Sequence, residues 1–177
     1  MNIFLPYEDN VIKSVEVLDN CRLIKQILET KQLLLNALHE SWGDEIKGYK
    51  NHPVYVHFKG NIPFLVYYGY IACQEYQYRF GKTHELFCEF SQLLQTKYTE
   101  YVDCVNYKVI QPPYTPYYME GSKGQPNYIR TTENVGNLFK QKLIKKWEND
   151  KAKGRPPKWT NREVPQFYQD FMKGEQK

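Results

Sequence analysis

The sequence lacks the features of several large protein classes. Its four cysteines, Cys21, Cys73, Cys88 and Cys104, form no C-x-x-C pair and no His/Cys cluster with zinc spacing. The N-terminus has no apolar core typical of a signal peptide. No apolar run approaches the 18 or so residues of a membrane span. We therefore expect free thiols, a reducing cytoplasm, no metal site and no contact with a membrane.

Internal repeats and alternating strand patterns are also missing. The GKT at 81–83 is not a P-loop, because the first glycine of that motif and its preceding strand are absent. A chain of 177 residues without these features predicts one domain. Such a chain can bury roughly 70% of the surface that its unfolded form exposes, so it needs no disulfide or metal to fold.

Charge is distributed unevenly along the chain. Residues 1–120 contain 11 Lys and Arg against 14 Asp and Glu, whereas residues 121–177 contain 13 against 6. The net charges are therefore −3 and +7. A basic C-terminal third suits a polyanionic partner, although a solvated basic helix would have the same composition.

Aromatic residues are abundant, with 16 Tyr, 9 Phe and 3 Trp. Many of them lie in 67–70, 76–80 and 114–118. Tyrosine stacks on nucleic-acid bases and donates hydrogen bonds. It also packs in helical cores with its hydroxyl at the surface, and we favour this reading for tyrosines that lie within helical patterns.

Hydrophobic periodicity predicts an all-α fold. The expected helices cover 9–17, 21–40, 61–80 from the Asn61 cap, 83–98 from the Thr83 cap, and 132–150, with a short apolar segment at 52–60. In the 21–40 helix, Leu23, Ile27, Leu34 and Leu38 form a buried stripe that Ile24, Leu28 and Leu35 are expected to widen.

The remaining segments are expected to be less regular. Residues 106–130 are rich in Pro, Tyr and Gly and are expected to form a long ordered loop. The C-terminal segment is expected to be irregular and to end in one helical turn. The predicted organisation is a compact single-domain helical bundle over residues 1–170, with a polar tail at 171–177.

The polar face of the 21–40 helix is the first candidate for chemistry. Arg22, Gln26 and Glu29 recur at three- and four-residue steps, so they share a face. Arg22 and Glu29 are seven residues apart, or about 10 Å, which leaves room for a sugar–phosphate between them. A glutamate in such a pocket is a common general acid or base. An ordinary solvated face has the same spacing.

The histidines and their basic neighbours are the second candidate. His84 follows Arg79 and Lys82 at a junction that places side-chain donors and backbone N–H groups at a helix N-terminus, which suits phosphate. His52 precedes a proline and lies in an extended segment. Each of these histidines alone is more often a capping or packing residue.

Several segments together resemble a known family. The opening NIFLPYEDNVIKSVEVLDNCRLIKQILETKQLL, NHP at 51–53, EYQYRFGKTHE at 75–85 and KWTNREVPQFY at 158–168 are similar to motifs of the pyrimidine-dimer DNA glycosylases, which are related to phage endonuclease V. The order and spacing of these motifs cover nearly the whole chain. The family's glutamate falls on Glu29, and Arg22 falls where members carry His or Arg.

The resemblance implies a mechanism and a place of action. In the phage enzyme an N-terminal amine attacks the sugar C1′ of the damaged nucleotide, a glutamate assists, and a Schiff base leads to strand cleavage by β-elimination. Here Met1 or Asn2 would supply the amine. Without it, Glu29 could activate water, as in a monofunctional glycosylase. The resemblance implies a bacterial or phage-infected host cell.

The sequence thus predicts a DNA glycosylase, with possible AP-lyase activity, that flips a damaged or modified base out of duplex DNA. Two alternatives stay open, namely an N-glycosidase acting on a free modified nucleotide and a non-catalytic DNA-binding module. The protein is expected to be a monomer without a cofactor. The predicted catalytic residues are Glu29, Asn2 and Met1; the predicted DNA or substrate contacts are Arg22, Lys25, Gln26, His52, Arg79, Lys82, His84, Tyr114, Lys145, Lys146, Arg155 and Arg162.

Overall fold

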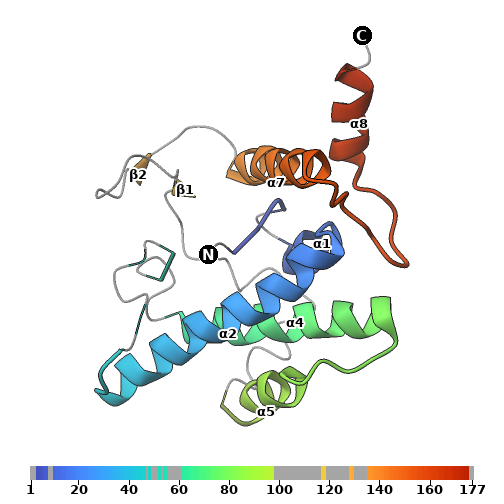
Figure 1. Cartoon of the computed structure of the whole chain (residues 1–177). Coiled ribbons are helices and arrows are strands. Elements are labelled where there is room, and N and C mark those ends of the chain that lie inside the picture. Colours follow the sequence, from blue (N-terminus) through green and yellow to red (C-terminus); the bar gives the residue numbers. More distant parts are fainter. Residues whose placement is uncertain are drawn as a thin grey trace.

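Six α-helices and one pair of two-residue strands form the secondary structure in the described part of this computed structural model (Figure 1). The described residues are 3–7, 10–46, 48, 52, 54–55, 61–97, 117–118, 128–129 and 135–175. The all-α class expected from the sequence is confirmed. The helices are α1 (Val11–Glu16), α2 (Asn20–Trp42), α4 (Ile62–Phe80), α5 (Phe87–Lys97), α7 (Val135–Ala152) and α8 (Gln166–Glu175).

Local sequence signals account for four helix ends in α1, α2 and α4. The Asn10 side chain accepts a hydrogen bond from the Lys13 N–H at the start of α1, and Asn61 accepts one from the Phe64 N–H at the start of α4. Gly43 and Gly81 end α2 and α4 in the left-handed conformation, with φ of 77° and 63°. The expected Thr83-capped helix is wrong in its start, because α5 begins at Phe87 after a turn.

The core forms where α2 packs on α4, and α4 packs on α1 and α5 (Figure 1). Leu23, Ile27 and Leu34 of α2 are completely buried in it. The N-terminal residues 3–5 are also buried, and the Phe4 ring meets the edge of Phe139 on α7. Residues 3–5 are therefore part of the core, and the Phe4 N–H donates to Gln26 of α2.

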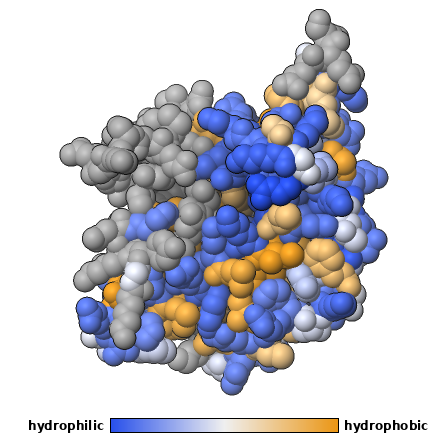
Figure 2. Space-filling view, in the orientation of Figure 1, coloured by the Kyte–Doolittle hydropathy of each residue, from blue (hydrophilic) through white to orange (hydrophobic). Residues whose placement is uncertain are grey.

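The buried face of α2 is narrower on one side than the sequence pattern predicted. Ile24, Leu28 and Leu35 are 39%, 49% and 39% exposed, so their assignment to the core stripe is wrong. The core instead takes Leu33 and Ala37 from the opposite flank of the stripe. Apolar surface over α2 is visible on this face of the molecule (Figure 2).

The C-terminal segment is more ordered than expected. The chain between α7 and α8 follows the α1–α2 turn: Asn20 N–H donates to the Lys158 carbonyl, and the Trp159 indole N–H donates to the Val17 carbonyl. Helix α8 then extends five residues into the predicted polar tail (Figure 1). The predicted helical turn is too short: α8 has 10 residues, and its Phe167 and Tyr168 pack on the buried Trp147 of α7.

The Pro/Tyr-rich segment lies mostly outside the described residues. Within it, β1 (Tyr117–Tyr118) and β2 (Tyr128–Ile129) pair antiparallel, with Tyr117 opposite Ile129. Across the described ranges, no helix has the length and apolar character needed to cross a bilayer.

Candidate active site

A cavity of about 350 Å³ lies where the N-terminal part of α2 faces the C-terminal end of α7 and the segment after it. Its volume is within the range of small-molecule and cofactor sites. The described residues that line it are Phe4, Asp19, Cys21, Arg22, Lys25, Gln26, Glu29, Lys146, Asp150, Arg155 and Pro156.

Six residues singled out from the sequence meet in this cavity. Four of them come from one face of α2, where turns of the helix bring them into line. Lys146 comes from α7 and Arg155 from the chain that follows it. The α2 residues are Arg22, Lys25, Gln26 and Glu29.

Glu29 is held by a hydrogen-bonded chain that begins at the N-terminal segment. The Gln26 amide nitrogen donates to Glu29 Oε2 at 3.2 Å. The Gln26 carbonyl oxygen accepts from the Phe4 N–H at 3.0 Å and from the Tyr68 hydroxyl at 3.1 Å. Burial, and then the charge of Glu29, raise the pKa of Tyr68, so its hydroxyl stays protonated and donating.

Gln26 itself does not reach solvent. Its side chain is committed to partners inside the protein, and the residue is 1% exposed. This burial gives no support to the prediction that Gln26 contacts DNA or substrate, although the residue belongs to the cavity lining. Within the site, one of its observed contacts is the hydrogen bond that it donates to Glu29.

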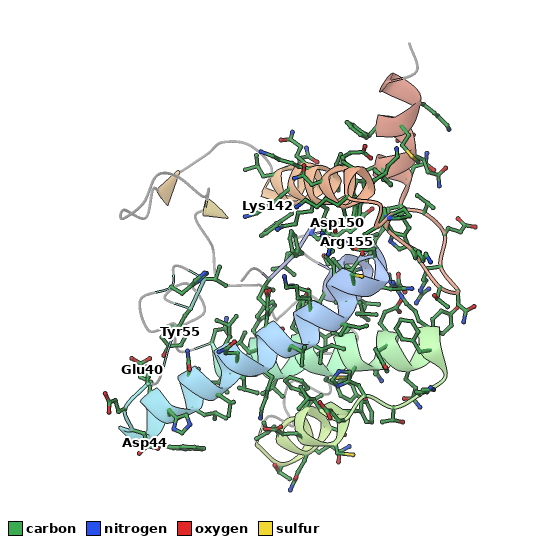
Figure 3. All side chains as sticks on the ribbon, in the orientation of Figure 1. Glu40, Asp44, Tyr55, Lys142, Asp150 and Arg155 are labelled. Atoms are coloured by element: carbon green, nitrogen blue, oxygen red, sulfur yellow. The ribbon has the colours of Figure 1, made fainter. Side chains whose placement is uncertain are left out.

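Arg22 bridges α2 and α7. Its guanidinium is 2.5 Å from Asp150 and 3.4 Å from Asp19. Asp19 also accepts a hydrogen bond at 2.8 Å from the buried Trp147 indole. The hydrogen bond from Arg22 lowers the pKa of Asp150, which stays ionised at neutral pH. Asp150 and Arg155 lie between α7 and the N-terminal end of α2 (Figure 3).

The cavity is suited to an anionic ligand that carries a polar reacting group. Its described lining has four cationic side chains and three carboxylates, a net charge of +1. Two of the carboxylates, Asp19 and Asp150, are paired with Arg22. Arg155 is exposed, and Lys25 and Lys146 are the further cations of the wall. Such a wall attracts phosphate, while Glu29 presents a carboxylate to the same space.

Two arginines predicted to bind DNA hold the fold together instead. Arg79 is 1% exposed; it donates to Glu75 and to the Leu18 and Glu16 carbonyls. Arg162 makes two hydrogen bonds to Glu75, at 2.9 and 2.7 Å, from the segment after α7. The prediction of DNA contact rested on the positive charge of these arginines. In the structure, both pair with Glu75. Neither prediction of DNA contact is supported by this geometry.

His52, His84, Lys82 and Lys145 are not among the described residues that line the cavity. His52 Nδ1 accepts from the Val54 N–H, and His84 Nδ1 accepts from the Leu86 N–H, so both histidines act as local caps. Burial lowers the pKa of His84, which favours this neutral accepting form. Lys82 and Lys145 are exposed at the α4–α5 junction and on α7.

Three predicted residues lie outside the described part of the chain, and five residues of the described lining were not predicted. Met1, Asn2 and Tyr114 lie outside the described residues. Sequence reasoning missed five lining residues; three of them come from outside α2 and its N-cap, and periodicity does not show which segment from elsewhere in the chain covers a polar face. For Asp19 a signal was present, since it lies in the opening segment that resembles the family, directly before the 21–40 helix. The five are Phe4, Asp19, Cys21, Asp150 and Pro156.

Comparison with known proteins identifies a family for the first half of the chain. Residues 1–87 match the family described as pyrimidine dimer DNA glycosylase. This segment contains α1, α2, α4 and the whole α2 wall of the cavity. The comparisons with curated proteins and with solved structures give no match.

Proposed function

Residues 1–87 belong to the pyrimidine dimer DNA glycosylase family, and from this premise we propose that the protein excises a damaged or modified base from duplex DNA, with Glu29 as the key carboxylate. One observation carries the proposal. The glutamate at the family's position shares a cavity with Arg22, Lys25, Lys146 and Arg155, which suit a sugar–phosphate backbone.

The proposed reaction breaks the bond between C1′ of the sugar and the base. Positive charge develops on the sugar as the base leaves with the bonding electrons, and the Glu29 carboxylate stabilises that charge. If water is the nucleophile, Glu29 takes a proton from it as its oxygen bonds to C1′, and the departing base takes up a proton. The products are a free base and an abasic site.

An amine nucleophile would extend the reaction to strand cleavage. The proposed amine, on Met1 or Asn2, bonds to C1′ in place of water and forms a Schiff base with the opened sugar. Loss of a proton from C2′ then expels the 3′ phosphate by β-elimination. The buried segment 3–5 supports this route, because Phe4 lies in the lining of the Glu29 cavity.

Access to C1′ requires the nucleotide to leave the base stack, at a cost of a few kcal/mol. The cationic side chains around the cavity offset part of this cost by binding the flanking phosphates. Arg22 would exchange Asp150 for a phosphate oxygen, because both are anionic acceptors for a guanidinium. Tyr114 stays a predicted stacking residue.

The decisive experiment is Glu29→Gln, which keeps the shape of the side chain and removes its charge. We expect turnover to fall by at least about 10²-fold, with folding and DNA affinity nearly unchanged. Glu45→Gln is the matched control, since Glu45 is exposed outside the cavity lining. Full activity of Glu29→Gln on the protein's true substrate would refute the assignment.

The substrate is identified with a panel of irradiated, uracil-containing, abasic and hypermodified duplexes, each incubated with borohydride. A trapped covalent complex would establish the amine route, whereas base release without trapping would establish the water route. An N-glycosidase acting on free nucleotides would bind with weak salt dependence. A duplex enzyme should show a steep dependence.

A further inference from the structure

We propose that Gln26 is a positioning residue that sets the Glu29 carboxylate relative to the start of the chain. This inference rests on the proposed catalytic role of Glu29. The residues involved come from three places: Gln26 and Glu29 from α2, Tyr68 from α4, and Phe4 from the N-terminal segment.

Only one orientation of the Gln26 amide satisfies its neighbours. The Phe4 backbone N–H can only donate, so it requires the carbonyl oxygen of the amide, at 3.0 Å. A carboxylate can only accept, so Glu29 Oε2 requires the amide NH₂, at 3.2 Å. A flipped amide would set donor against donor and acceptor against acceptor. The orientation of the Gln26 side-chain amide is therefore fixed.

Burial of the surrounding residues holds the amide in this orientation. Gln26 is 1% exposed and Phe4 is 3% exposed. Tyr68 is completely buried and places its hydroxyl 3.1 Å from the Gln26 carbonyl oxygen and 3.2 Å from the Phe4 carbonyl. An unsatisfied group in such a place is costly. The amide, the N-terminal segment and α4 thus share one buried junction, and the partly exposed Glu29 is attached to it.

This arrangement matters for a reaction at a single carbon atom. Glu29 has a flexible side chain at the edge of the cavity, and misplacement of a catalytic group by about 1 Å can cost roughly 10²-fold in rate. The amide N–H of Gln26, held in the buried junction, donates to the Glu29 carboxylate and keeps it next to Gln26. The same junction holds Phe4, so the carboxylate and the cavity wall formed by the N-terminal segment move together.

Gln26→Glu is the test, because it changes only the atom that faces Glu29. The new carboxylate keeps an oxygen for the Phe4 N–H and the Tyr68 hydroxyl but sets its second oxygen against Glu29. We expect kcat to fall by roughly 10- to 100-fold at neutral pH, with a much smaller change in KM. A residue that served only to hold Phe4 and Tyr68 would leave kcat unchanged.

Gln32→Glu is the matched control. It makes the same substitution and adds the same charge one turn after Glu29 on α2, at an exposed position outside the described cavity lining. Its kcat should equal that of the wild type. If Gln26→Glu and Gln32→Glu lowered kcat equally, added charge alone would explain the loss, and the positioning role would be refuted.

A double-mutant cycle with melting temperature as readout separates this inference from the proposed function. Glu29→Gln should partly restore the stability that Gln26→Glu loses, because an amide at 29 again faces a carboxylate at 26. Absence of this coupling would overturn the Gln26–Glu29 contact whatever the activity. Coupling with an active Glu29→Gln protein would refute the catalytic proposal and the positioning role that depends on it. A third outcome is that the two variants couple and Glu29→Gln is inactive, but Gln26→Glu has a normal kcat. This outcome would refute the positioning role alone.

Discussion

At the scale of single residues, burial separates side chains that look alike in the sequence. Ile27 and Leu28 are neighbours on α2, and both fit the apolar stripe, but Ile27 is completely buried whereas Leu28 is 49% exposed. The same distinction applies to charge. Arg79 lies inside the fold, while Arg155 is exposed at the cavity. Residue type alone therefore does not show which role a side chain has.

This contrast predicts unequal effects on stability. Ile27→Ala should lower the free energy of unfolding by about 2–5 kcal/mol, because it removes buried methyl groups and leaves a cavity. Leu28→Ala should lower it by less than about 1 kcal/mol, because half of that side chain already contacts water. Urea denaturation of the two variants measures both values. Equal losses would show that Leu28 is covered in solution.

At the scale of elements, α4 is the helix around which α1, α2 and α5 pack (Figure 1). Its contact with α5 is close at Gly69. A Cβ atom added there would lie 2.3 Å from the ring of Phe90, which is completely buried. The glycine is thus required by packing against a neighbouring helix, since a glycine inside a helix is otherwise unfavourable.

Gly69→Ala should therefore destabilise the protein, by about 1–3 kcal/mol, because the Phe90 ring or α5 must shift. Gly174→Ala on α8 is the control, since nothing lies within 4 Å of the added Cβ. That variant should be neutral or more stable by up to about 1 kcal/mol. Thermal denaturation of the two variants measures these changes in stability. A stabilised Gly69→Ala protein would contradict close α4–α5 packing.

At the scale of the whole molecule, the cavity is lined by residues from the N-terminal and the C-terminal parts of the chain. Its α2 wall comes from the segment that matches the family, and Lys146, Asp150 and Arg155 come from beyond that segment. At the cavity, the Arg22–Asp150 ion pair and the hydrogen bond from the Trp147 indole to Asp19 link the two parts directly. The basic C-terminal third thus contributes to the site itself.

Exposed cations on and after α7 should set the salt dependence of DNA binding. Lys145 and Lys153 are both exposed in this region. Changing both to Gln should weaken binding to all sequences about equally and reduce the slope of log K against log salt by roughly two. Binding titrations at several salt concentrations measure the slope.

Lys82→Gln provides the comparison, because Lys82 is exposed at the α4–α5 junction, outside the described cavity lining. A slope unchanged by Lys82→Gln and reduced by the double variant would place the duplex on the α7 side. A slope unchanged by the double variant would mean that this part of the basic surface only promotes solubility.

The sequence by itself determined the helical class, several helix ends and the polar face of α2 that lines the cavity. These features follow from local interactions: caps at Asn10 and Asn61, glycine ends at Gly43 and Gly81, and the periodic spacing of Arg22 and Glu29. The family resemblance over residues 1–87 was also readable from motif order.

Only the tertiary structure decided which neighbours complete the site. Asp150 comes to within 2.5 Å of Arg22 from 128 residues further along the chain, and Phe4 reaches Gln26 from the N-terminal segment. Helical periodicity orders side chains around one helix, but it contains no information on which other helix covers them. Arg79 was misassigned, and the support of Glu29 by Gln26 was missed, because burial and pairing arise when distant segments pack together.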